Sequence, residues 1–259
     1  MAVAGIDLGS QSTKAVILDG DRILAAVTLQ TGESAEAEAR QAMERALRQA
    51  NLTLEDLQNV ASTGAGRMHA PFAAMQYSTV SCLARGARHL FAQARTVVDA
   101  GAESSTAIRL SADGLVADVA TNDKCAGGSG TFLDNMSQML RISLADMGAA
   151  SLNATKAESI SSKCAVFAES EVISLVHRAP PVPLPDIVAG IHEAMVDRLF
   201  ALAQRVGMQP GVVMSGGVAK DIGVVRAMQD RCGLQVSVPD DPQILGALGA
   251  ALLAQQGPA

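Results

Sequence analysis

The chain has 259 residues, of which 49% are hydrophobic and only 2% aromatic, and its formal net charge is −6 at pH 7. This composition argues against nucleic acid as a partner, because binding to the phosphate backbone needs clusters of Lys and Arg. Single strands also need aromatic side chains on which their bases stack. The length fits one large or two small domains with a substantial core.

The N-terminus, MAVAGIDLGS, lacks the charged start and apolar core of a signal peptide. No run of about 18 apolar residues that could span a membrane appears. We therefore expect a cytoplasmic protein with no membrane partner. In such a protein the four cysteines indicate thiols or a metal site rather than a disulfide framework.

The first part of the chain reads as strands and helices joined by short turns. Residues 3–9 are expected to form a buried strand that ends in a tight turn, and a hairpin turn at residues 19–21 joins the next two strands. Apolar residues at helical spacing predict a helix over residues 35–50. The other predicted elements are strands over residues 15–18, 22–29, 59–63 and 95–99 and a helix over residues 78–91.

The pattern of the N-terminus returns 92 positions later (99 − 7). Residues 99–105 align with residues 7–13, so that Asp99 and Gly101 fall on Asp7 and Gly9. Strands predicted over residues 107–110 and 115–120 fall on the second and third strands of the chain. We interpret this as the internal duplication of one unit: strand, Asp-x-Gly turn, strand, hairpin and strand.

The rest of the chain is mostly helical by pattern. Two helices follow the cysteines at positions 125 and 164, and a proline-rich loop is predicted over residues 178–185. A strand from residue 211 runs into a turn at Gly216 and Gly217. The other predicted elements are helices over residues 186–206, 218–229 and 243–253 and a strand over residues 234–238.

The Asp-x-Gly turns have the chemistry of a phosphate site. Glycine lets the backbone approach a phosphate, hydroxyl and N–H groups donate hydrogen bonds, and a lysine offsets charge. The carboxylate of Asp7 suits a magnesium ion held through its waters. One such turn is weak evidence, but the duplicate and the glycine turn at residues 216–217 strengthen it. Neither a Walker A motif nor a dinucleotide-binding glycine motif is present.

Cys125 and Cys164 lie 39 positions apart (164 − 125), and each follows a lysine and precedes a predicted helix. The N-terminus of a helix favours a thiolate, and thiolates bind soft metals and iron–sulfur clusters. Two cysteines cannot complete a zinc site or a [4Fe–4S] cluster, but two chains can supply two each. The alternative is that both are small buried residues, as we expect for Cys82 and Cys232.

Three segments resemble the first phosphate, second phosphate and adenosine motifs of the superfamily of actin, sugar kinases and heat-shock chaperone ATPases: GIDLGSQSTK, VVDAGAES and VVMSGGVAKD. Two more, NDKCAGGSGTFLD and SSKCAVFAESEVIS, resemble the cysteine motifs of the BadF/BadG/BcrA/BcrD ATPase family. That family comprises benzoyl-CoA reductase ATPase subunits and 2-hydroxyacyl-CoA dehydratase activators. The segments IVAGIH and GALGAA also resemble it, so the resemblance covers nearly the whole chain.

The resemblance implies an α/β, duplicated ribonuclease-H-like fold with a nucleotide cleft between two domains. The expected subdomains span residues 1–94 and 95–259; the second carries the cluster cysteines, and its last helix, at about residues 243–255, packs back on the first. In the family, two ATPase subunits share one [4Fe–4S] cluster. ATP binding and hydrolysis there drive a low-potential electron to a partner that reduces an aromatic ring or dehydrates a 2-hydroxyacyl-CoA.

The family's site residues carry over by motif. Cys125 and Cys164 would bind the cluster, and Asp7 and Asp99 would face Mg²⁺, with Glu103 as the third catalytic candidate. The expected partners are a second ATPase subunit, a CoA-ester reductase or dehydratase component, and a ferredoxin-type electron donor. The residues expected to bind ATP are Gly9, Ser10, Gln11, Ser12, Thr13, Lys14, Gly101, Ala102, Gly216, Gly217 and Lys220.

The second phosphate motif departs from the family. Dehydratase activators typically read Asp-Ile-Gly-Gly-Gln-Asp there, whereas this chain has Glu103 and Ser104 at the last two positions. A carboxylate there could orient water but would repel a γ-phosphate that no metal bridges. The altered motif resembles one of the two unlike ATPase subunits of benzoyl-CoA reductases. We therefore favour a reductase subunit with a non-identical sister over a homodimeric dehydratase activator.

Two other functions remain open at this stage. One is a cluster-free kinase of the same superfamily that phosphorylates a small molecule. The other is an assembly subunit that binds ATP without hydrolysing it. The sequence does not specify the acyl-CoA, the electron donor, the oligomer, or whether this chain hydrolyses ATP.

Overall fold

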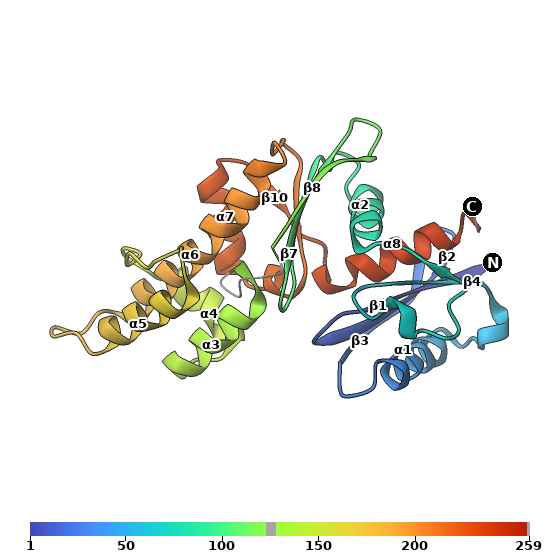
Figure 1. The fold of residues 1–259 in the computed structure, drawn as a ribbon, viewed down its shortest axis with the longest axis horizontal. Coiled ribbons are helices and arrows are strands. Elements are labelled where there is room, and N and C mark those ends of the chain that lie inside the picture. The colour runs from blue at the N-terminus through green and yellow to red at the C-terminus, as the bar shows by residue number, and fades with distance from the viewer. Residues whose placement is uncertain (123–127, 258–259) are drawn as a thin grey trace. The chain divides into compact units, whose positions relative to one another are not determined.

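The computed structural model describes residues 1–122 and 128–257 (Figure 1). These residues form two compact units. The first unit comprises Met1–Ala94, Leu110–Val116 and Pro239–Ala259, and the second unit comprises Arg95–Arg109 and Ala117–Val238. No helix in the described ranges combines the length and apolar composition that a bilayer crossing requires.

The first unit is built on a five-stranded sheet with the order β3-β2-β1-β4-β5. Its central strand β1 pairs antiparallel with β2 and parallel with β4. Because side chains alternate across a strand, β1 sends Ala4 and Ile6 to one face and Val3 to the other. The strands are β1 (Ala2–Leu8), β2 (Ser12–Asp19), β3 (Arg22–Gln30), β4 (Leu57–Thr63) and β5 (Met75–Gln76).

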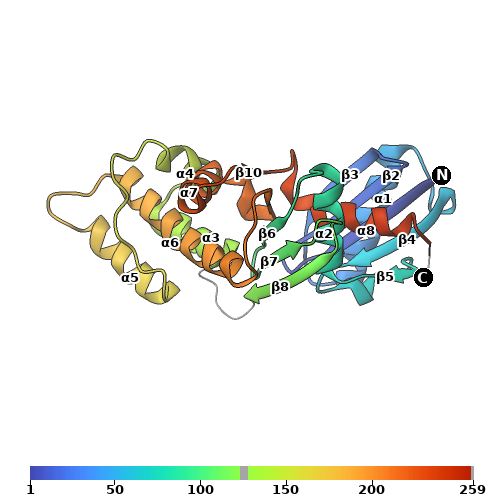
Figure 2. The same cartoon turned by 90° about the horizontal axis from the view of Figure 1, so that it is seen from above.

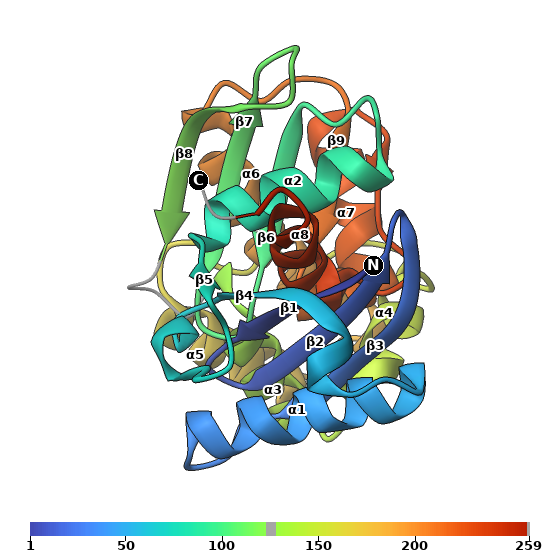
Figure 3. The same cartoon turned by 90° about the vertical axis from the view of Figure 1, so that its right-hand side faces the viewer.

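Helices cover both faces of this sheet, as Figure 3 shows. Helix α1 (Ala35–Ala50) covers one face, and α8 (Leu245–Ala254) covers the other with α2 (Thr79–Leu90) beside it. Helix α8 packs so closely that a Cβ on Gly249 would lie 1.8 Å from the carbonyl oxygen of Cys82. This confirms the expectation that the small residues of this helix allow close packing.

The second unit repeats the strand order of the first. Its sheet runs β10-β9-β6-β7-β8, and β6 pairs antiparallel with β7 and parallel with β9. Strands β6 to β10 therefore correspond one by one to β1 to β5, which confirms the duplicated fold. The strands are β6 (Thr96–Ala100), β7 (Ser105–Leu110), β8 (Val116–Asn122), β9 (Val212–Ser215) and β10 (Val236–Ser237).

The helices of the second unit share one core with its sheet. The long helix α6 is central to it, with α7 and α4 in contact with α6 and with each other, and α5 in contact with α6 (Figure 2). These helices are α3 (Gly130–Leu140), α4 (Leu144–Ser151), α5 (Ala165–Val176), α6 (Leu184–Arg205) and α7 (Ile222–Cys232).

Three local expectations were wrong. Helix α6 begins at Leu184, inside the predicted proline loop, because Pro185 occupies the first turn, where its missing N–H costs nothing. The helix expected from residue 218 is instead a 3₁₀ turn, Gly217–Lys220, followed by α7, since Asp221 caps the new helix with its side chain. Helix α4, which Ser143 caps, was not predicted.

Candidate functional site

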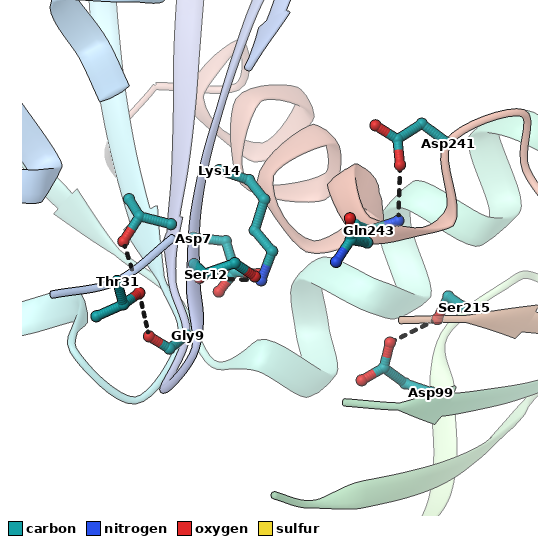
Figure 4. A network of polar contacts seen from close by, with 10 residues as sticks. Asp7, Gly9, Ser12, Lys14, Thr31, Asp99, Ser215, Asp241 and Gln243 are labelled. Carbon is teal, nitrogen blue, oxygen red and sulfur yellow. Dashed lines mark hydrogen bonds and ion pairs between the residues drawn. The ribbon is translucent and has the colours of Figure 1, made fainter. Parts of the chain in front are cut away.

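The first Asp-x-Gly turn joins β1 to β2 and is closed by a hydrogen bond from the Gly9 N–H to the Ser12 carbonyl oxygen (3.1 Å). Asp7 lies opposite Lys14 in the strand register, and the Lys14 Nζ is 3.5 Å from the Asp7 Oδ2. Lys14 also donates to the Ser12 carbonyl oxygen at 3.1 Å (Figure 4). The side chains of both charged residues are only about an eighth exposed, at 12% and 13%, so solvent screens the pair weakly.

The turn is held from its other side by Thr31. The Thr31 hydroxyl donates to the Gly9 carbonyl oxygen (3.1 Å) and lies 3.3 Å from the hydroxyl of the buried Thr13. The Thr31 N–H donates to the Gln11 carbonyl oxygen. Thr13 therefore orders the turn from within. Ser10 and Gln11 are exposed, while Ser12 and Lys14 lie on the face of β2 that bears Asp7.

Two glycines leave room for the Asp7 carboxylate. Gly64 has a φ of 90°, and a Cβ there would lie 2.4 Å from the Asp7 Oδ1. A Cβ on Gly246, at the start of α8, would lie 3.1 Å from the Asp7 Oδ2. Sequence reasoning missed both residues and Thr31; the Gly-x-Gly after β4 was the available signal, and it was interpreted only as a loop.

The second Asp-x-Gly turn repeats the geometry of the first. The Gly101 N–H donates to the Ser104 carbonyl oxygen at 2.9 Å, the same pair of positions 92 residues on (101 − 9). Asp99 accepts a hydrogen bond from the Ser215 hydroxyl at 2.7 Å (Figure 4). Ser215 also went unrecognised, because it reaches Asp99 only through the pairing of β6 with β9.

The start of α3 is fastened to this second turn. The Gly130 N–H donates to the Gly101 carbonyl oxygen (2.8 Å), and Thr131 donates to the Ala102 carbonyl oxygen through both its N–H and its hydroxyl. These bonds position Gly101 and Ala102. The third catalytic candidate, Glu103, is exposed.

The predicted adenosine turn follows β9. Gly216 has a φ of 86°, and a Cβ there would lie 2.2 Å from the carbonyl oxygen of Ala100. Only glycine fits both the left-handed backbone and this contact. The turn thus lies directly against the end of β6. Gly217 and Lys220 are exposed in the 3₁₀ turn that follows.

Of the two predicted cluster ligands, only Cys164 lies within the described residues; Cys125 falls in residues 123–127, outside them. Cys164 is the N-cap residue of α5, which confirms that this thiol stands at a helix start. It is a free, partly exposed cysteine. Cys82, by contrast, is wholly buried in α2, and desolvation raises its pKa to about 12.

The described residues alone do not make a complete metal site. No group of three or more His, Cys, Asp or Glu side chains in residues 1–122 and 128–257 could hold a metal ion. Cys164 fits the role of one thiolate ligand by its chemistry, its partial exposure and its place before a helix. The other ligands would have to come from Cys125 and from a second chain.

A cavity of about 610 Å³ lies in the second unit, between residues 151–157 and the helices α6 and α7. None of the residues predicted to bind nucleotide or cluster lines it; its walls include Ser151, His192 and Gly223. The nucleotide chemistry therefore gathers at the glycine turns and not in this cavity.

The strand order, the two Asp-x-Gly turns and the third glycine turn define an ATPase of the sugar-kinase class. A glucokinase of the ROK family from Streptomyces griseus, in complex with glucose and AMPPNP, has the same fold with a TM-score of 0.61 at 14% identity, over 99% of this chain and all of that one. At this identity the likeness establishes the fold alone.

The chain belongs to the BadF/BadG/BcrA/BcrD ATPase family, whose model matches residues 4–254. It is 42% identical over 257 residues to the activator of lactoyl-CoA dehydratase of Anaerotignum propionicum, covering 99% of this chain and 98% of the relative. It is 36% identical over 261 residues to one of the subunits of the benzoyl-CoA reductase of Thauera aromatica, covering 96% and 91%.

A solved structure agrees with this membership. The activator of the 2-hydroxyisocaproyl-CoA dehydratase from Clostridium difficile, with bound ADPNP, superposes with a TM-score of 0.93 at 40% identity, covering 99% of this chain and 95% of that one. The dehydratase activators are thus more similar to this chain than the reductase protein is. The comparisons favour the alternative over our preferred interpretation as a benzoyl-CoA reductase subunit.

Proposed function

We propose that this protein is an ATP-dependent electron activator of a 2-hydroxyacyl-CoA dehydratase. The observation that carries the proposal is the pair of matched Asp-x-Gly turns in a chain whose Cys164 caps a helix. Relatives that share this whole length at about two-fifths identity are dehydratase activators. One of them has been solved with bound ADPNP, which supports ATP as the nucleotide here.

In this proposal the residues of the first turn bind phosphate. Lys14 is held in place by Asp7 and the Ser12 carbonyl oxygen, so its charge is positioned before a nucleotide arrives. Preorganised donors of this kind stabilise phosphate without reorganisation. Asp7 and Asp99 would hold Mg²⁺ through its waters, and Ser215 fixes the orientation of the Asp99 carboxylate. Where the nucleotide lies relative to the two units stays a prediction.

A [4Fe–4S] cluster, when bound, supplies the low-potential electron. Cys164 and Cys125 would each contribute one thiolate, and a second ATPase subunit would contribute two more. A ferredoxin-type protein would reduce the cluster, and the dehydratase component would accept the electron.

Anaerobic purification with iron and acid-labile sulfide analysis tests the cluster. We expect about two irons per chain, four shared by two subunits, and a brown, oxygen-sensitive protein. Cys164→Ala should lose the iron, while Cys232→Ala, the matched control for a partly buried free thiol, should keep it. Colourless wild-type protein without iron would refute the proposal and leave a cluster-free kinase.

Benzoyl-CoA reductase remains a second candidate partner because of one observation: Glu103 stands where dehydratase activators typically have glutamine, and it is exposed in the second turn. Supplying the ATP-loaded protein to each partner enzyme separates the two. Dehydration of a 2-hydroxyacyl-CoA supports the first proposal, and reduction of benzoyl-CoA supports the second.

A further inference from the structure

Helix α6 touches the adenosine turn through one residue and the cysteine-bearing segments through another. The two residues, His192 and Arg198, are six positions apart, or about 9 Å along a helix axis. Between them α6 is anchored in the core by residues such as Met195 and Val196, each at most 1% exposed. A helix packed this tightly moves as a body and does not bend freely.

His192 makes the first contact. Its side chain is 1% exposed. Its Nδ1 lies 3.0 Å from the hydroxyl of Ser151 at the end of α4, and its Nε2 lies 3.3 Å from the Oδ2 of Asp221. The Asp221 Oδ1 meanwhile accepts the N–H groups of Gly223 and Val224. His192 thus joins α6 to the residue that ends the adenosine turn and begins α7.

This junction has no slack. A Cβ on Gly223 would lie 2.1 Å from the Ser151 Oγ and 2.7 Å from the His192 Nδ1, and one on Gly148 would lie 2.7 Å from the Asp221 Oδ1. Both helices therefore approach the imidazole at glycine positions. A displacement of the adenosine turn cannot be absorbed here by empty space and has to move α6 or break the contact.

Arg198 makes the second contact, and it lies between the two cysteine motifs. Its Nε donates to the carbonyl oxygen of Ser162, two residues before Cys164. On the other side, a Cβ on Gly128 would lie 3.6 Å from the Arg198 Cβ, and Gly128 comes three residues after Cys125. One side chain of α6 therefore contacts the chain beside both predicted ligands.

We propose that α6 transmits the nucleotide state of the adenosine turn to the cysteine segments, with Arg198 as a positioning residue for those segments and His192 as the contact to the turn. The inference rests on the proposed function for the identity of the two sites it connects. Spatial intermediacy alone does not establish coupling, so the test must measure the response of one site to the other.

The test uses the full-length chain freed of iron, with ADP or a non-hydrolysable ATP analogue bound. Iodoacetamide alkylation is followed peptide by peptide, so each cysteine gives its own rate. In the wild type we expect the Cys164 rate to differ by about fivefold or more between the nucleotides, the lower end of common allosteric couplings. Buried Cys82 should stay unlabelled in every sample, since its labelling would report unfolding.

In Arg198→Met the difference should fall below about twofold, while the nucleotide Kd stays within about twofold of the wild type. Arg198→Lys keeps the charge but not the planar donor and should restore part of the response. His192→Asn, whose amide can still reach Ser151 but not Asp221, should also lose it. Arg205→Met, an exposed arginine of the same helix, should respond like the wild type.

Equal Cys164 rates with both nucleotides in the wild type would overturn the inference, and so would a full response in Arg198→Met and His192→Asn. If Arg198→Met does not fold, Arg198→Lys and His192→Asn decide. Iron analysis separates this result from the proposed function. A nucleotide-responsive thiol in a protein that binds no iron would support the link through α6 and refute the cluster, whereas an unresponsive thiol in an iron-loaded protein would do the reverse.

Discussion

The ion pair between Asp7 and Lys14 should be coupled more strongly than a surface pair. Two unit charges 3.5 Å apart attract by about 5 kcal/mol at an effective dielectric constant of 20. Desolvation and the ordering of the lysine chain offset more than half of this. Because the two side chains are only 12% and 13% exposed, we expect a coupling energy of about 2 kcal/mol from the variants Asp7→Asn, Lys14→Met and the double variant.

The natural probe for this measurement is Tyr77, which is the only tyrosine in a chain without tryptophan and lies in the first unit. Urea unfolding followed by Tyr77 fluorescence therefore reports the unit that carries the pair. The matched control is the cycle on Glu36 and Arg40, an ion pair one helical turn apart whose side chains are 55% and 54% exposed. Its coupling should be about 0.5 kcal/mol or less.

The comparison of the two cycles gives the refutation directly. If the coupling between Asp7 and Lys14 is no larger than that of the control pair, solvent screens the turn as it screens a surface. Lys14 is then not preorganised by Asp7, and the account of phosphate binding by the first turn fails.

Three further predictions concern single residues. Gly216→Ala should lower the free energy of unfolding by about 3 kcal/mol, measured by urea denaturation, because it combines a left-handed backbone with a Cβ placed 2.2 Å from the Ala100 carbonyl oxygen; a loss under about 1 kcal/mol would contradict this. Glu103→Gln should raise the ATP hydrolysis rate about tenfold, a change of about 1.4 kcal/mol in barrier, if its carboxylate repels the γ-phosphate; an unchanged rate in a phosphate-release assay would exclude that repulsion. Cys82, with a pKa raised from 9.0 to about 12 by burial, keeps its proton in the fold while the unfolded chain ionises. Its stabilisation is complete below pH 9 and is lost between pH 9 and 12, so stability by circular dichroism should fall up to about 1.4 kcal/mol per pH unit more steeply than in Cys82→Ala; equal slopes would show that the thiol ionises in the fold.

Local patterns in the sequence were sufficient for much of the fold. The helix predicted over residues 35–50 is α1 at Ala35–Ala50, because Ser34 caps its start and Asn51 takes the left-handed conformation at its end. The duplication was visible because an Asp-x-Gly turn constrains both composition and spacing. Helix α4 escaped notice because its eight residues have weak periodicity and Ser143 is its main signal.

The site was harder to predict than the fold, since its partners come from distant segments. The turn residues could be assigned from their motifs, but Ser215 reaches Asp99 across 116 positions and Thr31 reaches Gly9 across 22. Nothing local marks these contacts. Thr13 illustrates the converse: its position in the motif suggested a phosphate contact, but the alternation of β2 turns it inward to Thr31.

The two halves of the chain diverge most between their third and fourth strands. In the first half, β3 leads through α1 to β4, whereas in the second half the stretch from β8 to β9 holds α3, α4, α5 and α6 and includes both cysteine motifs. The proposed redox chemistry thus occupies an elaborated crossover, which leaves strand pairing untouched on either side. Evolution could graft such a module onto an ancient nucleotide-handling scaffold, and exchange of this segment between relatives should yield chimaeras whose sheets assemble normally.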